Sequence, residues 1–275
     1  MERPKIAITL GDVAGIGPEV VVRACTDPDV RGQCRPTVVG DARVLDNTAR
    51  LLGNSLRIIS VDDCDDAQYP NDVVPCWNPA DISLADVVPG RIDARAGRAA
   101  YDFLVAATRA TLADRFDAIV TAPINKAALR LAGINYPGHT EILAEMCGCD
   151  RFAMMLYLPT GPQVISPNGL GVAHVTLHTS LSSVPRLLST AGVNEKIELL
   201  CGFMQDVGCA HPRIAVCALN PHAGEDGLFG DEERTIIAPA VASARESGID
   251  ASGPFPADTL LRRAVAGEFD GVVAM

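Results

Sequence analysis

Short β-branched and apolar runs alternate with amphipathic stretches along all 275 residues, and this alternation limits the fold more than any other feature. It is typical of βαβ units, in which buried parallel strands are joined by helices that cover the sheet. The pattern predicts an α/β fold. Strands are expected at residues 5–10, 36–39, 56–59, 118–121, 153–158, 171–177, 213–218 and 271–274. Helices are expected at residues 18–25, 42–52, 94–113, 124–132, 141–147, 193–207 and 232–247.

Two segments do not follow the alternation. Residues 61–89 are rich in Asp and Pro and predict a loop-dominated stretch with at most one short strand. Residues 159–169 contain two turn signals and predict an extended hairpin between two strands. A boundary near residues 122–126 would divide the chain into lobes 1–125 and 126–275, and we expect a cleft between these lobes.

The charge and composition exclude several classes of protein. The chain has 34 acidic and 23 basic side chains, and no region concentrates Lys or Arg. This argues against a nucleic-acid surface, and an anionic substrate would need a local positive site. No apolar run approaches the length of a membrane span, and the N-terminus lacks a signal-peptide core.

Nine cysteines are scattered along the chain. The close pair Cys147 and Cys149 lacks the two-residue spacing of a zinc knuckle or of a redox motif. The pattern favours reduced cysteines that act as small apolar residues, and with them a cytoplasmic protein.

Two polar segments follow predicted strands in the first half of the chain. Gly11–Glu19 is rich in glycine and opens a helix, but it has neither the Rossmann spacing nor the P-loop spacing. A structural turn and a ligand-binding loop both remain open for it. Lys126 lies where another strand gives way to a helix, in Thr-Ala-Pro-Ile-Asn-Lys. Ligands of open α/β sheets bind at such strand ends, although a lysine there is often simply solvated.

Further candidates begin helices. Thr140 is expected to be an N-cap, with His139 either a loop residue or, beside Thr140, a donor to an anionic substrate. Asp258 lies in Gly253–Thr259, which is expected to form a rigid loop that presents this acid before a helix. It is either a helix cap or a carboxylate directed at the cleft.

The histidines of the second half suggest a metal site. If residues 171–177 form a strand, His174 and His178 share a face but are roughly 13 Å apart, too far to bind one ion. His178, at the carboxyl end of that strand, is the better ligand, whereas His174 is expected to line the core. His222 follows another strand in the same way, so His178 and His222 could converge on Zn²⁺ or another divalent ion.

Six collinear strings resemble the 4-hydroxythreonine-4-phosphate dehydrogenase family over essentially the whole chain. This family comprises a pyridoxal phosphate (pyridoxine) biosynthesis enzyme and relatives that oxidise sugar-acid phosphates. The strings are Ile-Thr-Leu-Gly-Asp-Val-Ala-Gly-Ile-Gly-Pro-Glu, Thr-Ala-Pro-Ile-Asn-Lys, Gly-His-Thr-Glu, Met-Met-Leu, Asn-Pro-His-Ala-Gly-Glu and Gly-Pro-Phe-Pro-Ala-Asp-Thr. Two features depart from the family pattern: Val13 replaces the usual proline, and residues 159–169 form a longer segment than expected.

The resemblance implies an isocitrate-dehydrogenase-like, two-lobed α/β/α sandwich that works as a homodimer with the metal site at the interface. It implies NAD- or NADP-dependent oxidation and decarboxylation of a small phosphorylated hydroxy acid, assisted by Zn, Mg or Co. His178 and His222 match two metal ligands, and His139 and Thr140 match the substrate-binding pair. Lys126 and Asp258 are candidates for proton transfer or for orienting the substrate. No cofactor-contacting residue is assigned.

The resemblance leaves alternatives open. In the family, Val-Val-Ala-Met is followed by Tyr-His-Asp-Gln-Gly, whose histidine is the third metal ligand. We therefore expect residues 1–275 to be a truncated chain that is inactive or unstable alone. Relatives include erythronate or threonate 4-phosphate dehydrogenases and cis-dihydrodiol dicarboxylate dehydrogenases. A phosphate or acyl transferase on the same fold would not need the two histidines.

Overall fold

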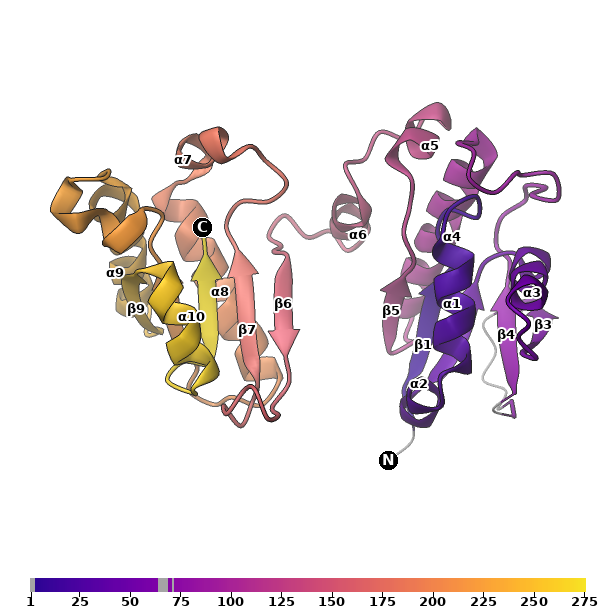
Figure 1. Ribbon diagram of the computed structural model, residues 1–275, viewed down its shortest axis with the longest axis horizontal. Helices are drawn as coiled ribbons and strands as arrows, with labels where there is room; N and C mark the ends of the chain where they lie inside the picture. The colour runs from indigo at the N-terminus through magenta and orange to yellow at the C-terminus, as the bar shows by residue number, and fades with distance from the viewer. Residues whose placement is uncertain (1–2, 64–68, 71) are drawn as a thin grey trace. The chain divides into compact units, whose positions relative to one another are not determined.

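The computed structural model describes residues 3–63, 69–70 and 72–275. The chain forms two compact units, Met1–Asp150 and Arg151–Met275, each with its own sheet and core (Figure 1). The boundary between them thus follows residue 150, whereas residues 122–126 lie inside the first unit. The reason is local packing, because the two helices after that point, α5 and α6, both contact the long helix α4 of the first unit.

The first unit is built on a parallel sheet with the strand order β3-β4-β2-β1-β5 in its described part. The strands are β1 (Lys5–Thr9), β2 (Arg35–Val39), β3 (Arg57–Val61), β4 (Val73–Trp77) and β5 (Ala118–Thr121). The central strand β1 pairs with β2 on one side and with β5 on the other. β4 is the short strand expected in residues 61–89, of which residues 64–68 and 71 lie outside the described part.

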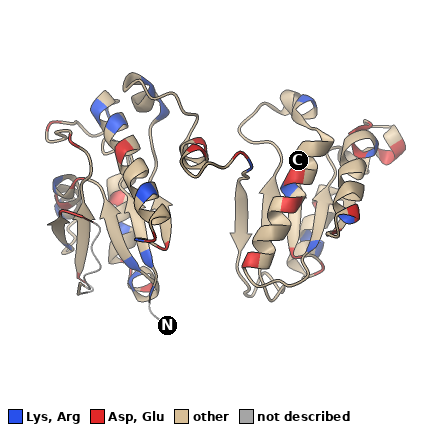
Figure 2. Ribbon diagram, turned by 180° about the vertical axis from the view of Figure 1, so that it is seen from behind, with Lys and Arg blue, Asp and Glu red and all other residues tan. Residues whose placement is uncertain are grey.

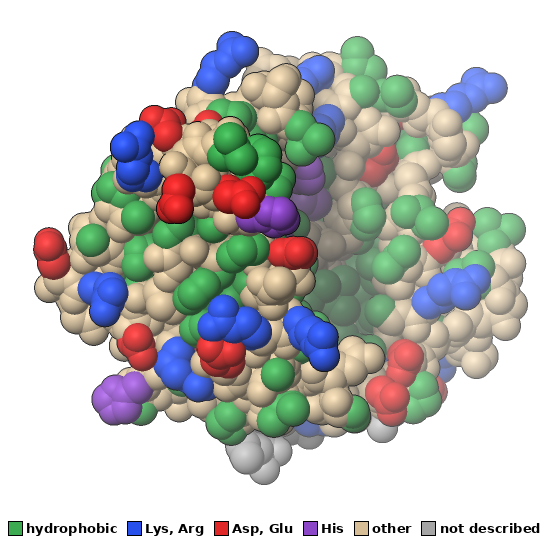
Figure 3. Space-filling model, turned by 60° about the vertical axis from the view of Figure 1, so that its left-hand side comes forward, with side chains coloured by type: hydrophobic (Ala, Val, Ile, Leu, Met, Phe, Trp, Pro, Cys, Tyr) green, Lys and Arg blue, Asp and Glu red, His purple; other side chains and the backbone are tan. Residues whose placement is uncertain are grey.

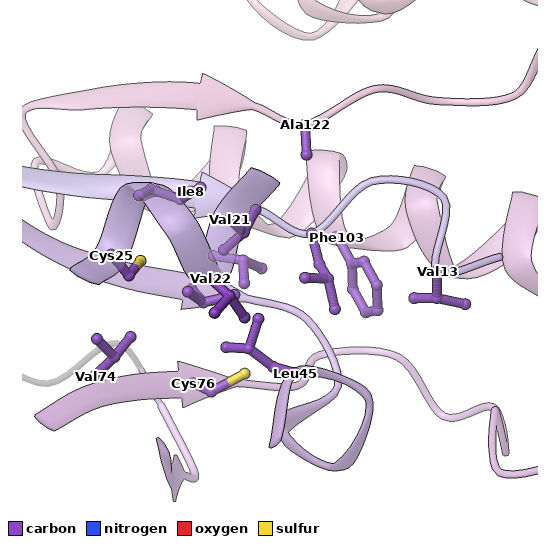
Figure 4. Close-up of a cluster of buried hydrophobic side chains, with 14 of the residues drawn as sticks. Ile8, Val13, Val21, Val22, Cys25, Leu45, Val74, Cys76, Phe103 and Ala122 are labelled. Atoms are coloured by element: carbon purple, nitrogen blue, oxygen red, sulfur yellow. The ribbon is translucent and has the colours of Figure 1, made fainter. Parts of the chain in front are cut away.

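Helices cover both faces of this sheet. They are α1 (Gly17–Thr26), α2 (Pro28–Gln33), α3 (Ala42–Leu51), α4 (Ala94–Leu112), α5 (Lys126–Leu131) and α6 (His139–Met146). The chain moves from β1 to β2 in one direction across the sheet and from β4 to β5 in the other. Right-handed crossovers therefore place α1 and α3 on one face and α4 on the opposite face. Their side chains form one hydrophobic cluster with the strands (Figure 4).

The second unit has a mixed sheet with the order β6-β7-β10-β8-β9. Its strands are β6 (Met155–Leu158), β7 (Leu170–His174), β8 (Arg213–Cys217), β9 (Asp250–Phe255) and β10 (Gly271–Ala274). β6 pairs antiparallel with β7, which confirms the hairpin expected around residues 159–169, and the other pairs are parallel. The Arg213 guanidinium and the Ser166 hydroxyl donate to the buried Asp270 carboxylate, which fixes the start of β10 against β8 and the hairpin loop.

Helices of this unit also cover its sheet. They are η1 (Leu181–Ser183), α7 (Val184–Leu187), α8 (Thr190–Asp206), η2 (Pro221–Gly227), η3 (Glu233–Ile237), α9 (Ala238–Glu246) and α10 (Ala257–Val265). Buried side chains of α8 and α9 form one cluster with the sheet, and those of α10 form another. The expected α/β fold with helices on both sides of each sheet is therefore confirmed.

Three local predictions were wrong. β7 ends at His174, so the strand does not extend to residue 177. Residues 253–255, expected in a rigid loop, belong to β9. Pro254 is tolerated there because β9 is an edge strand. Glycine is needed at residue 253, because a Cβ there would lie 2.5 Å from the Val216 carbonyl oxygen. Thr140 is not an N-cap, because α6 begins at His139 after Gly138.

Charged side chains show no segregation by sign. Lys and Arg are interspersed with Asp and Glu along the ribbons of both units (Figure 2). Within the described residues, no helix combines the length and the apolar character that a bilayer crossing requires.

Candidate functional site

Three of the predicted segments meet at the carboxyl edge of the first sheet. The Asp12 N–H, in the glycine-rich loop after β1, donates to the Pro123 carbonyl oxygen after β5 (2.9 Å). Gly11 has φ +67°, and a Cβ there would lie 2.4 Å from the same oxygen. Only glycine combines this backbone conformation with so close an approach. The loop therefore lies directly on the Thr121–Lys126 segment.

Asp12 is a candidate that sequence reasoning did not single out. Its side chain is buried, and its Oδ1 accepts a hydrogen bond from the Ala14 N–H (2.9 Å). Burial raises the pKa of Asp12, the Ala14 hydrogen bond opposes this shift, and the nearby Asp93 carboxylate adds to it. The available signal was a single acid inside a glycine-rich loop at a strand end.

Lys126 is the first residue of α5 and is exposed. Asn125 is the N-cap, and its Oδ1 accepts hydrogen bonds from the N–H groups of Ala127 and Ala128. The Asn125 side chain is therefore used to cap the N-terminus of α5, while the Lys126 ammonium remains accessible at the carboxyl edge of the sheet.

His139 joins the same edge from α6. Its Nε2 lies 3.2 Å from the Ala122 carbonyl oxygen, which can only accept, so Nε2 carries a proton. Burial lowers the pKa of His139, although the Ala122 hydrogen bond opposes this shift. In the neutral ring Nδ1 is then a hydrogen-bond acceptor, which suits a hydroxyl or ammonium group of a ligand. This differs from the expectation that His139 donates to an anionic substrate. Thr140 is exposed on the first turn of α6.

In the second unit, both predicted metal ligands follow parallel strands at one sheet edge. His178 comes four residues after β7 and His222 comes five residues after β8. β10 lies between these strands, so their axes are roughly 10 Å apart. Met275 lies at the same edge, where its carbonyl oxygen accepts from the Thr176 hydroxyl (2.8 Å). The loops after β7 and β8 can therefore approach each other across the end of β10.

Both histidines have a left-handed backbone, with φ of 48° for His178 and 51° for His222. The four residues after His222 also have positive φ; these are Ala223, Gly224, Glu225 and Asp226. For residues with a Cβ this conformation costs roughly 1–2 kcal/mol each. Unfavourable backbone conformations of this kind concentrate at functional sites, and this supports the choice of His178 and His222.

A buried acid holds the His222 loop. Glu233 accepts hydrogen bonds from the N–H groups of Leu219 (2.8 Å) and Asn220 (2.7 Å) and from the Asn220 side chain (3.0 Å). Burial raises the pKa of Glu233, but these hydrogen bonds together outweigh it, and the pKa is lowered overall. Sequence reasoning missed this residue, because its separation from Asn220 gives no local signal.

The donor set fits a divalent ion that accepts imidazole. Both histidines are exposed; the His222 Nδ1 lies 3.5 Å from Glu225 Oε2, and the His222 ring packs edge-on against Phe229. Two imidazoles suit Zn²⁺ or Co²⁺, but a catalytic zinc usually has three protein ligands. No group of three or more His, Cys, Asp or Glu side chains suited to one metal ion occurs among the described residues.

The two other candidates of this unit occupy different surroundings. The His174 Nδ1 is buried without a hydrogen-bond partner in the described structure, at the end of β7. Asp258 is exposed in the first turn of α10, where Pro256 occupies the N-cap position, so the alternative of a helix cap is wrong for Asp258. Its Oδ1 accepts from the Thr259 N–H (2.9 Å).

The family model described as pyridoxal phosphate biosynthetic protein PdxA matches residues 32–275. The chain belongs to this family.

Relatives of the chain agree in reaction class. It is 43% identical over 273 residues to a 4-hydroxythreonine-4-phosphate dehydrogenase of Geobacter metallireducens, covering 99% of this chain and 78% of the relative. It is also 43% identical over 275 residues to a D-threonate 4-phosphate dehydrogenase of Cupriavidus necator, covering 99% and 79%. The crystal structure of a 4-hydroxythreonine-4-phosphate dehydrogenase from Klebsiella pneumoniae superposes with a TM-score of 0.88 at 37% identity, covering 98% and 81%. The expected family, the two-lobed α/β fold and the class of oxidoreductase acting on CH–OH are therefore confirmed.

Proposed function

We propose that this protein oxidises and decarboxylates a four-carbon hydroxy acid phosphorylated at C4, with NAD (or NADP) as the hydride acceptor. The equal identity to a 4-hydroxythreonine-4-phosphate dehydrogenase and a D-threonate 4-phosphate dehydrogenase carries the proposal. The substrates in those two names share the carboxylate, the C3 hydroxyl and the phosphate. They differ at C2, which bears an ammonium group in one and a hydroxyl in the other.

His178 and His222 would hold the divalent ion in this proposal. When bound, the ion would lower the pKa of the substrate hydroxyl and stabilise negative charge after loss of carbon dioxide, while NAD would accept the hydride. Glu233 would hold the start of the loop that carries His222 through its hydrogen bonds to Leu219 and Asn220. We assign no residue to NAD, because the Gly11–Glu19 loop has neither familiar phosphate-binding spacing.

The first unit would anchor and orient the substrate. Neutral His139 offers Nδ1 as an acceptor to a substrate hydroxyl or ammonium group, and Thr140 offers its exposed hydroxyl. The Lys126 ammonium supplies a positive charge for the phosphate or carboxylate. Asp258, in the second unit, is a candidate for proton transfer because its carboxylate is exposed.

Turnover tests the reaction and the substrate class. The formation of NADH is followed with 4-phosphohydroxy-L-threonine, with D-threonate 4-phosphate, with D-erythronate 4-phosphate and with an unphosphorylated cis-dihydrodiol dicarboxylate. We expect reduction of NAD with at least one phosphorylated acid and its loss after chelation of metal ions. Failure to reduce NAD with any of these acids would contradict the proposed reaction, and turnover of the unphosphorylated dicarboxylate alone would contradict the proposed substrate class.

Metal binding tests the two histidines independently of turnover. Titration calorimetry with Zn²⁺ or Co²⁺ should show that His178→Ala and His222→Ala each weaken binding by at least about tenfold. His211→Ala is the matched control. His211 is exposed and does not lie at the carboxyl edge of either sheet, so its replacement should leave the metal affinity unchanged. Unaltered affinity in both site variants would contradict the metal assignment. Catalytic activity retained in both histidine variants would favour a phosphate or acyl transferase on this fold, because that reaction would not need the two histidines.

We also propose that the protein is a cytoplasmic homodimer, as the family resemblance implies. The edge strand β6 supports a subunit contact, because Leu156 and Leu158 lie on one of its faces and are both exposed. Figure 3 shows hydrophobic side chains exposed among charged ones on the second unit. Light scattering should give twice the chain mass, and Leu156→Glu should reduce the dimer fraction. A monomeric parent would contradict this proposal.

A further inference from the structure

The segment Cys147-Gly148-Cys149 folds back on itself where α6 ends. The Gly148 N–H donates to the Glu145 carbonyl oxygen (3.1 Å), and the Cys149 N–H donates to the Ala144 carbonyl oxygen (2.9 Å). Gly148 has φ +62°. These are the two hydrogen bonds and the left-handed glycine of a Schellman motif. The turn therefore reverses the chain between the two cysteines.

The same turn directs the Cys149 side chain back toward Cys147. The Cys149 Sγ lies 3.6 Å from the Cys147 carbonyl oxygen, so its side chain is directed back over the preceding cysteine. Across such a turn the two Cα atoms are roughly 5–6 Å apart, within the range found in disulfides. Both cysteines are exposed. The pair is thus accessible to a small reagent, and its Cα separation permits ring closure.

The other described cysteines lie in different surroundings. Cys34 is half-buried, and the rest are buried in the cores; these are Cys25, Cys76, Cys201, Cys209 and Cys217. Burial raises the pKa of Cys25 to about 12 and that of Cys217 to about 11. Because the thiolate is the reactive form, these buried thiols react slowly at neutral pH. Of the cysteines the structure describes, Cys147 and Cys149 alone are exposed.

We propose that Cys147 and Cys149 form a dithiol site that small-molecule disulfides oxidise to an intramolecular disulfide. One cysteine loses its proton to water, and its thiolate attacks a sulfur of the reagent, forming a mixed disulfide and releasing one reagent thiolate. The second cysteine, also as a thiolate, attacks the sulfur of the first and releases the second reagent thiolate. The two cysteine sulfurs are oxidised, and the reagent disulfide is reduced to two thiols.

The site lies one residue before the boundary between the compact units, at Asp150 and Arg151. It also ends the helix whose first residues are His139 and Thr140. A closed ring would add a covalent constraint to this hydrogen-bonded turn. The site does not depend on the proposed dehydrogenase function, since its chemistry needs only the two thiols.

Mass spectrometry of the native, fully reduced chain tests the proposal. After exposure to oxidised glutathione, we expect the peptide that contains residues 147–149 to lose about 2 Da, the mass of two hydrogens, and to retain no glutathione. Peptide mapping should then place a disulfide between residues 147 and 149. Cys147→Ser and Cys149→Ser lack the second thiol, so each should instead retain one glutathione on its remaining cysteine.

Cys34→Ser is the matched control, and it should lose the same mass as the parent chain. The proposal would be overturned if the parent retained glutathione on Cys147 or Cys149. It would equally be overturned if both thiols remained fully open to alkylation after treatment, or if the ring formed between other cysteines. Circular dichroism of each serine variant checks that the fold is retained, as expected for exposed positions.

Discussion

At the scale of single residues, burial sets the proton affinity of His139. Its pKa lies below the ordinary value because the charged ring would be desolvated, so the folded chain binds this proton less readily than the unfolded chain. Stability therefore falls as the pH decreases below about 6.5. The loss is complete below the folded-state pKa.

His139→Gln should remove this part of the pH dependence. Glutamine can still donate to the Ala122 carbonyl oxygen but does not titrate. Urea unfolding between pH 7 and pH 5 should show a shallower loss of stability than in the parent, whereas His211→Gln, at an exposed position, should keep the parent's slope. Equal slopes in all three proteins would show that His139 is not desolvated.

At the scale of secondary-structure elements, a single glycine sets the distance between α4 and α5. A Cβ at Gly97 would lie 2.3 Å from the carbonyl carbon and oxygen of Ala128, so the two backbones are in direct contact. Because α5 begins with Lys126, this contact also determines where the lysine lies at the sheet edge.

Gly97→Ala should lower the stability of the first unit by roughly 1–3 kcal/mol, the usual cost of overpacking a close contact. Gly202→Ala is the control, since Gly202 lies within α8 and has open space around its Cβ position. That change should be neutral or stabilise by up to about 1 kcal/mol, because alanine favours helix. Thermal unfolding measures both, and equal melting temperatures would contradict the close packing.

At the scale of the whole molecule, the two units have separate cores and should respond separately to mutation. Asp270 belongs to the second unit. Burial raises its pKa, but hydrogen bonds from Arg213 and Ser166 outweigh this, and the pKa is lowered overall. The stabilisation by its carboxylate is therefore present above about pH 4 and is lost as the pH falls through the folded-state pKa.

Asp270→Asn should destabilise the second unit by about 2 kcal/mol at pH 7, and the difference from the parent should shrink in acid. Hydrogen exchange should show the loss of protection in residues 151–275 and not in residues 3–150. Glu268→Gln breaks an exposed ion pair with Arg263 and should cost less than about 1 kcal/mol. Equal loss of protection in both units would contradict their independence.

The fold class and most of the strands and helices follow from the sequence alone, because hydrophobic periodicity is a local property. The helix caps did not: Asp41 before α3 and Ser189 before α8 accept hydrogen bonds from the helix N-terminus, whereas Thr140, and Asp258 as one of two alternatives, were expected as caps. Collinear motifs determined the family. Strand ends were less predictable, since β7 stops at His174 where its partner β10 ends, not where β-branched residues stop.

The tertiary structure alone decided how the candidate site is held. Residues 11, 122 and 139 meet because parallel strands bring distant loops to one edge, and no local pattern encodes that meeting. The same holds for Glu233, whose side chain reaches the Asn220 loop across thirteen residues. Burial also decided the protonation of His139, because desolvation depends on the whole surrounding fold and not on neighbours in sequence.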